Sequence, residues 1–181
     1  MMRTVFGALA CALALTAITP AAHAQDDLEE RRKAAAALAD NAFDLLQQGL
    51  LAEAADLFRE ANERFHSPMF VLFRADAEEK QGHLVEARAL LQSILDEELA
   101  EYAPSSFHKA NEDANKRVAA LDDRVPRVTI TVSGATSGPW KVTLDGKPLT
   151  AAELTDPVPL NPGTHQVRVA TNDGRHDERS F

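Results

Sequence analysis

The chain of 181 residues is poor in the residue types on which many active sites depend. Its one cysteine is Cys11, so it forms no intrachain disulfide, and a mature chain lacking residue 11 has no thiolate metal ligand or thiol nucleophile. The sequence contains no His-Glu-x-x-His motif, glycine-rich phosphate loop or Gly-x-Ser-x-Gly motif. We therefore expect no catalytic residues, no metal ligands, no cofactor and no enzymatic activity.

Long apolar runs are also scarce, and the one present lies at the amino terminus. Val5 to Ile18 is apolar after the basic Arg3, and Ala22-His23-Ala24 has the small-x-small form of a signal-peptidase site. We predict a signal peptide over residues 1–24 with cleavage after Ala24, which makes the mature chain periplasmic or secreted and leaves it without a membrane span. An uncleaved anchor and a lipidated Cys11 are the alternatives.

Basic residues are few in the first part of the mature chain. Residues 25–123 hold 22 acidic and 11 basic residues, a net charge of −11, whereas residues 124–181 hold 6 and 7. This acidic balance excludes nucleic acid as a partner, because phosphates need a basic surface. Ala, Leu, Glu and Arg dominate before this boundary and Val, Thr, Pro and Gly after it, so we predict an α+β protein: a helical domain over 28–123 and a strand-rich domain over 126–181.

Apolar residues at helical spacing predict five helices in the first domain. Gly49 and Gly82 are expected to end the first and third helices, and Ser67 to cap the third, which has Pro68 in its first turn. The fifth helix, from about Ser105 to Asp122, is expected to cover the last apolar face. The apolar stripes are Leu38, Ala42, Leu45 and Leu46; Ala54, Leu57, Phe58, Ala61 and Phe65; Val71 and Ala75; Leu84, Ala87, Leu91, Ile94 and Leu95; and Phe107, Ala110, Ala114, Val118 and Leu121.

An internal repeat organises these helices. Residues 48–54 and 81–87 share Gln, Gly, Leu, Glu and Ala at equivalent positions, a period of 33 residues that is typical of stacked helical hairpins. The matching set over residues 34–100 resembles the tetratricopeptide repeat (TPR): Leu38, Ala42, Leu45, Gly49, Leu51, Ala54, Phe58 and Ala61, then Val71, Ala75, Gly82, Leu84, Ala87, Leu91 and Ile94. The chain departs from that pattern at Leu38 and Val71, where Trp is usual, at Arg74, usually apolar, at Glu78, often Tyr, and at Pro68, two positions late.

The TPR resemblance implies a binding face. In that family partners bind along the first helix of each pair, and the matching positions here are Phe43, Leu46, Gln47, Leu72, Asp76, Glu79 and Lys80. An exposed Phe43 beside Leu46 is a candidate anchor for a peptide. The alternative is that both side chains pack against a neighbouring helix.

Alternating residues predict strands in the second domain. Val128, Ile130 and Val132 form one stripe, residues 140–144 a second strand, and residues 165–169 a third. Residues 133–139 and 149–157 are expected to be loops, and Asp145-Gly146 and Asn161-Pro162-Gly163 to be tight turns. Together these strands predict a small β-sandwich.

The turns of this domain resemble those of PEGA-type domains. Leu144-Asp145-Gly146 followed by Pro162-Gly163-Thr164-His165 has the order of that family's hairpin and Pro-Gly-x-His turn, over residues 126–181. Such domains occur in bacterial envelope proteins and are thought to mediate binding. They continue with further strands, so we expect that residues 177–181 begin an incomplete strand and that the sequence is truncated; an open sheet edge is the alternative.

The combination of signal peptide, helical repeats and PEGA-like segment resembles secreted repeat proteins of myxobacteria. It predicts an exported, non-enzymatic scaffold or adaptor that binds a peptide or protein through the repeats. The alternative is a cell-envelope protein that binds peptidoglycan glycan through the β domain, with Trp140 stacking on a sugar, unless Trp140 is buried in the sandwich.

Overall fold

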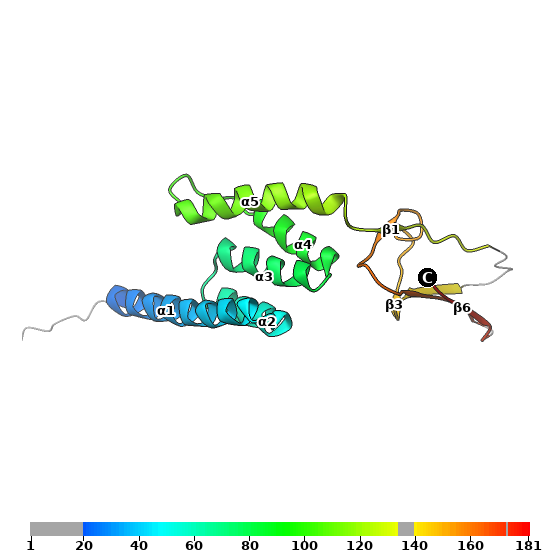
Figure 1. Ribbon diagram of the computed structural model, residues 1–181, viewed down its shortest axis with the longest axis horizontal. Helices are drawn as coiled ribbons and strands as arrows, with labels where there is room; N and C mark the ends of the chain where they lie inside the picture. The colour runs from blue at the N-terminus through cyan, green and yellow to red at the C-terminus, as the bar shows by residue number, and fades with distance from the viewer. Residues whose placement is uncertain (1–19, 134–139, 173) are drawn as a thin grey trace, which may run out of the picture.

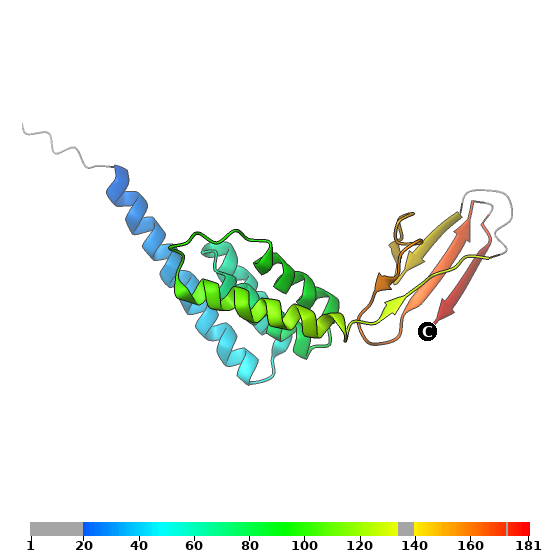
Figure 2. The same ribbon diagram turned by 90° about the horizontal axis from the view of Figure 1, so that it is seen from above.

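The computed structural model describes residues 20–133, 140–172 and 174–181 (Figure 1). Residues 1–19 of the predicted signal peptide and residues 134–139 of the predicted loop lie outside this part. Five helices are followed by six short strands in the described residues, which confirms the α+β prediction. The helices gather at one end of an elongated molecule and the strands at the other (Figure 2).

The helices form two successive antiparallel pairs and a fifth helix. Their bounds are α1 Pro20–Gln47, α2 Leu51–Arg64, α3 Pro68–Lys80, α4 Leu84–Leu95 and α5 Ser105–Asp122. Gly49 and Gly82 follow α1 and α3 with φ angles of 79° and 86°, so both predicted helix ends are confirmed. Among the described helices, none combines the length and apolar composition needed to cross a membrane.

The hydrogen bonding at the start of α3 differs from the prediction. Pro68 is in the first turn as expected, but the Ser67 side chain makes no capping hydrogen bond in the described structure. Instead the Ser67 backbone N–H donates to Oδ1 of Asn62 on α2, at 2.9 Å. The turn is therefore held from the preceding helix rather than by the predicted serine cap.

Two apolar clusters stabilise the helical domain. The repeated alanines Ala54 and Ala87 are fully buried, each in a different cluster, where their small side chains allow helices to approach closely. Phe58 fills the cluster between α1, α2 and α3, and Leu91 fills the cluster between α3, α4 and α5. The helix α3 contributes to both clusters and so joins the two hairpins.

The helix α5 covers the second hairpin. Its buried residues Ala110, Ala114, Val118 and Leu121 share a cluster with residues of α3 and α4. Figure 1 shows α5 along one side of these helices, and Val125, just after α5, is buried in the same cluster. The predicted covering role of this helix is thus what the structure shows.

The strands form two antiparallel sheets. Their bounds are β1 Arg127–Val128, β2 Trp140–Leu144, β3 Lys147–Pro148, β4 Val158–Pro159, β5 Gln166–Thr171 and β6 His176–Ser180. The larger sheet has the order β3-β2-β5-β6, and β1 pairs with β4. Asp145 and Gly146 have φ angles of 49° and 79°, as the predicted hairpin turn requires.

The first predicted strand is much shorter than its alternating residues suggested. Pairing stops after Val128, so Ile130 and Val132 lie outside β1. In this antiparallel register Thr129 would lie opposite Pro157, which has no N–H to donate, so the ladder does not extend past Val128. Residues 130–133 instead line a hollow of about 350 Å³ with β5 and β6, and the second layer of the predicted sandwich is only partly formed. The strand β6 pairs with β5 along its length.

Candidate functional site

Two of the seven residues predicted to bind a partner are core residues. Leu46 is buried with Ala54 and Phe58, and Leu72 is buried in the cluster that contains Leu91. The prediction that they line a binding face is therefore wrong. Helical spacing turns them toward the neighbouring helix of the stack, where burial of their apolar surface stabilises the fold.

Phe43 is both packed and exposed. Its ring meets that of Phe73 edge to face, with centroids 5.6 Å apart, and Phe73 stacks on the buried Phe58 at 5.5 Å. Phe43 nevertheless remains 42 % exposed, and Gln47, one turn further along α1, is exposed. The three rings thus form a row that runs from the core to the surface, with Phe43 at its exposed end.

Asp76, Glu79 and Lys80 take part in ion pairs with one another or with α5. Lys80 lies 2.7 Å from Asp76, one turn away on α3. Glu79 lies 2.7 Å from Arg117 and also pairs with Arg124, while Arg117 lies 3.6 Å from Asp76. These charges therefore fasten α5 to α3, in addition to any role in binding.

The pKa of Glu79 reports the balance of forces in this cluster. Burial of the carboxylate alone would raise its pKa. The hydrogen bonds from Arg117 and Arg124 outweigh burial, and the pKa of Glu79 is lowered below its ordinary value. Glu79 is consequently ionised at neutral pH and holds both guanidinium groups.

The five charged residues line an open hollow of about 480 Å³ between α3 and α5. Together with Phe43 and Gln47 they make up what we call the inner face: Phe43, Gln47, Asp76, Glu79, Lys80, Arg117 and Arg124. One end of this face is aromatic and the other carries charges of both signs. Such a face can bury an apolar side chain of a partner and exchange ion pairs with its charged groups.

The sequence analysis assigned no binding role to Arg117 or Arg124. Arg117 lies on α5, whereas Arg124 lies in the turn just after the helix ends at Asp122, so helical spacing does not relate the two arginines. Their shared partner Glu79 cannot be found from spacing, because it lies 38 residues from Arg117.

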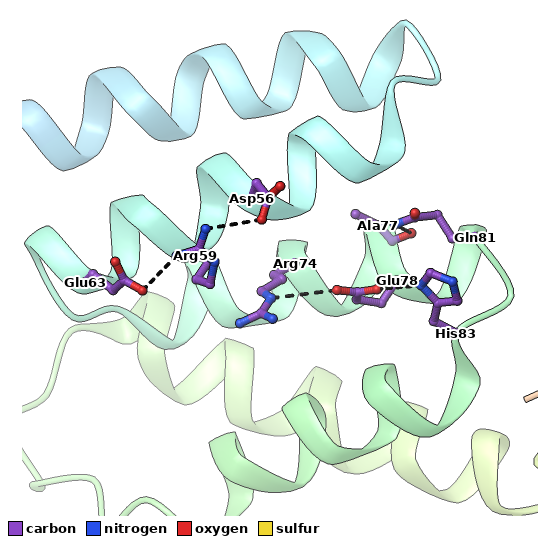
Figure 3. Close-up of polar contacts among 8 residues, drawn as sticks. All are labelled: Asp56, Arg59, Glu63, Arg74, Ala77, Glu78, Gln81 and His83. Carbon is purple, nitrogen blue, oxygen red and sulfur yellow. Dashed lines mark hydrogen bonds and ion pairs between the residues drawn. The ribbon is translucent and has the colours of Figure 1, made fainter. Parts of the chain in front are cut away.

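The two charged departures from the TPR pattern lie together beside the turn between α3 and α4. Arg74 lies 3.9 Å from Glu78, and Glu78 accepts a hydrogen bond from Nδ1 of His83 at 2.9 Å (Figure 3). Nε of Arg74 is buried without a hydrogen-bond partner in the described residues. The ion pair offsets part of the cost of placing two charges where apolar or aromatic residues are usual, but it supplies no hydrogen bond to Nε of Arg74.

Trp140 is not in the buried core of the β domain. The core positions of β2 are Val142 and Leu144, whereas Trp140, at the start of the strand, is 37 % exposed. It lies opposite Thr171 of β5. The interpretation that Trp140 is buried in the sandwich is therefore wrong, and its ring is accessible to a ligand.

Within the described ranges, no group of three or more His, Cys, Asp or Glu side chains is arranged to hold a metal ion. His66 and His83 each contact one carboxylate, as His66 does with Glu97 at 2.9 Å, and His165 contacts one carboxylate and one backbone carbonyl. The inner face, whose charged end is an open hollow, is a candidate ligand site.

Comparison with known proteins gives no match: no family model, no curated protein and no solved structure is significantly similar to this chain.

Proposed function

We propose that the protein is an exported, non-enzymatic scaffold or adaptor that binds a peptide or protein at the inner face of TPR-like repeats. The observation that carries the proposal is Phe43, whose ring packs edge to face on Phe73 yet remains 42 % exposed. A rigid aromatic ring at a surface loses little conformational freedom when it is covered, which favours binding.

The charge around Phe43 indicates the kind of partner. Asp40, one turn before Phe43, is exposed, and residues 25–123 have a net charge of −11. Opposite charge speeds the encounter of two molecules and disfavours wrong partners. The partner we propose is a segment with an apolar side chain flanked by Lys or Arg.

A random peptide library displayed on phage, selected against the mature chain of residues 25–181, tests this function. We expect the selected peptides to combine apolar with basic residues. Affinity of a synthetic selected peptide should fall at least about tenfold in Phe43→Glu, because an anchor in a protein interface commonly contributes more than about 1.4 kcal/mol. Lys80→Ala should alter the affinity as well, since Lys80 borders the hollow.

Ala52→Glu is the matched control, because Ala52 is exposed on α2 and outside the inner face. It should bind the peptide as the unaltered chain does, and circular dichroism should show that all variants are folded. Equal peptide affinity of the unaltered chain and Phe43→Glu would falsify the proposal.

A second candidate function rests on Trp140. An exposed indole ring can stack on the face of a sugar, and this one lies on the PEGA-like β domain. The corresponding proposal is an envelope protein that binds peptidoglycan glycan.

Sedimentation with purified peptidoglycan separates the two candidates. Co-sedimentation that disappears in Trp140→Ala supports glycan binding, and Phe43→Glu should leave it intact. If the unaltered chain stays in the supernatant, the glycan proposal is discarded and the adaptor proposal is unaffected.

A further inference from the structure

Asn161 connects the two domains through side-chain contacts. It lies in the turn between β4 and β5, and its Oδ1 accepts a hydrogen bond from the backbone N–H of Val85 at 2.9 Å. Its Nδ2 donates to the Glu86 carboxylate at 2.7 Å. Val85 and Glu86 belong to the first turn of α4, and the preceding His83 contributes no side-chain cap in the described structure. Asn161 therefore performs the role of a capping residue from 76 positions away.

The strand pair β1–β4 holds the Asn161 turn close to the helices. The backbone N–H of Leu160 donates to the carbonyl of Pro126 at 2.9 Å, and Val128 pairs with Val158. Pro126 follows Val125, which is buried in the helical core. The turn is consequently anchored within a few residues of α5.

His165 holds the other side of the same turn. Its Nε2 lies 2.7 Å from the carbonyl oxygen of Asn161, and its Nδ1 lies 2.7 Å from Oδ2 of Asp145. A carbonyl oxygen and an ionised carboxylate can only accept hydrogen bonds. Both contacts are hydrogen bonds only when both ring nitrogens carry a proton, so this geometry is that of a charged imidazolium.

We propose that His165 and Asn161 form a proton-dependent joint between the two domains. With both nitrogens protonated, the ring holds the Asn161 carbonyl, and the Asn161 side chain caps α4. When the ring loses one proton to solvent, it can donate to one acceptor only. The lone pair of the bare nitrogen then faces the other oxygen, the turn shifts, and the cap on α4 weakens.

The charged groups around His165 fit this direction. Asp145 in the β2–β3 turn faces the His165 ring, and Lys147 of β3 lies near Asp145. Glu86 of α4 is hydrogen-bonded to the Asn161 side chain. On β6, Arg179 pairs with Asp177 at 3.5 Å. The ring of Phe181, also beside β6, has its centroid 5.9 Å from that of His165. The hydrogen bonds to Asp145 and then to the Asn161 carbonyl raise the pKa of His165 above its ordinary 6.5, against the effect of burial. A raised pKa means that the joint is formed at low pH and is lost as the pH rises through that pKa.

Amide hydrogen exchange of Val85, measured by NMR on the chain of residues 25–181, tests the joint. The protection of this amide, corrected for the intrinsic effect of pH, should fall roughly fivefold as the pH rises, because that is the usual effect of losing a helix cap. The fall should coincide with the titration of His165, followed by its imidazole chemical shifts in the same samples. In Asn161→Ala, Val85 should be poorly protected at every pH while His165 still titrates.

His83 is the group that could mimic this result, because it adjoins α4 and hydrogen-bonds to Glu78 at 2.9 Å. In His83→Gln the pH step at Val85 should remain, whereas in His165→Gln the protection should be independent of pH. A flat profile in the unaltered chain, a step that survives in His165→Gln, or a step that disappears in His83→Gln would each overturn the proposal. If His165→Gln does not fold, the unaltered chain still provides a test. A fall in Val85 protection whose midpoint pH differs from that of the His165 titration would overturn the proposal.

Discussion

The carboxylate of Glu79 on α3 lies 2.7 Å from the guanidinium of Arg117 on α5. Because Glu79 also pairs with Arg124, one carboxylate holds two cations, one on the covering helix and one in the turn that follows it. The charged end of the inner face is therefore also an interface between helices, and a substitution there has a cost in stability that must be separated from any loss of binding.

Glu79→Gln should lower the free energy of unfolding at neutral pH by about 1 kcal/mol, because it leaves two partly covered arginines without their carboxylate. The pKa of Glu79 is lowered in the folded chain, so its stabilising effect is present above the ordinary pKa of 4.5. The difference in free energy of unfolding between the unaltered chain and Glu79→Gln should shrink as the pH falls through the pKa of Glu79 in the folded chain. Urea unfolding at several pH values measures this difference.

Glu112→Gln is the matched control for that prediction. Glu112 pairs with Lys116 at 2.7 Å on the exposed side of α5, where solvent screens the attraction. The free energy of unfolding should therefore change much less in Glu112→Gln than in Glu79→Gln. If Glu112→Gln is as destabilising as Glu79→Gln, the ion pairs between α3 and α5 do not fasten the covering helix.

Gly82→Ala should destabilise the chain by about 1 kcal/mol, because a side chain disfavours positive φ. Gly82 has a φ of 86°, and a Cβ built there meets nothing within 4 Å, so the cost is conformational rather than steric. Gly82→Asn should cost less, since Asn tolerates this backbone region. Thermal unfolding ranks the three chains, and an equal Tm for Ala and Gly would contradict the argument.

Asn62→Ala should destabilise the chain by about 1 kcal/mol, since the Ser67 N–H loses the acceptor it has at 2.9 Å. Ser67→Ala should cost less, because the Ser67 hydroxyl makes no capping bond in the described structure. Chemical unfolding of both variants decides between the observed contact and the serine cap predicted from the sequence. If Ser67→Ala is more destabilising than Asn62→Ala, the Ser67 side chain caps α3 as the sequence predicted.

Phe58→Ala should cost about 3–5 kcal/mol, the usual effect of emptying a buried aromatic site. Phe58 is almost fully buried, whereas Phe43 retains solvent contact, so Phe43→Ala should cost a much smaller amount. Urea unfolding of the two variants gives the comparison. Comparable losses would mean that Phe43 is chiefly a packing residue, which would weaken its role as an anchor.

Features that depend on a few neighbouring residues were predictable from the sequence. The fifth helix spans Ser105–Asp122, as its apolar stripe indicated, and β2 spans Trp140–Leu144. Gly49, Gly82 and Asp145-Gly146 take the backbone angles expected of them. Each of these is a property of local conformational preference, which does not require a distant partner.

The errors share a different physical origin. Ile130 and Val132 alternate like strand residues but lie outside any strand, because pairing depends on the length and composition of β4. Leu46 and Leu72 matched the positions of a binding face, yet the neighbouring helices bury them. A pattern identifies an apolar side chain, but the packing of other elements determines whether it meets protein or solvent.

The sequence by itself determined the helical repeat, the ends of its helices and the change to strands, because backbone angles and apolar periodicity are encoded within a turn or two of chain. The tertiary structure alone decided which polar groups meet: Arg117 with Glu79 across 38 residues, and Asn161 with the start of α4 across 76. Such contacts form between side chains that folding brings together, and their partners lie beyond the range of any local pattern.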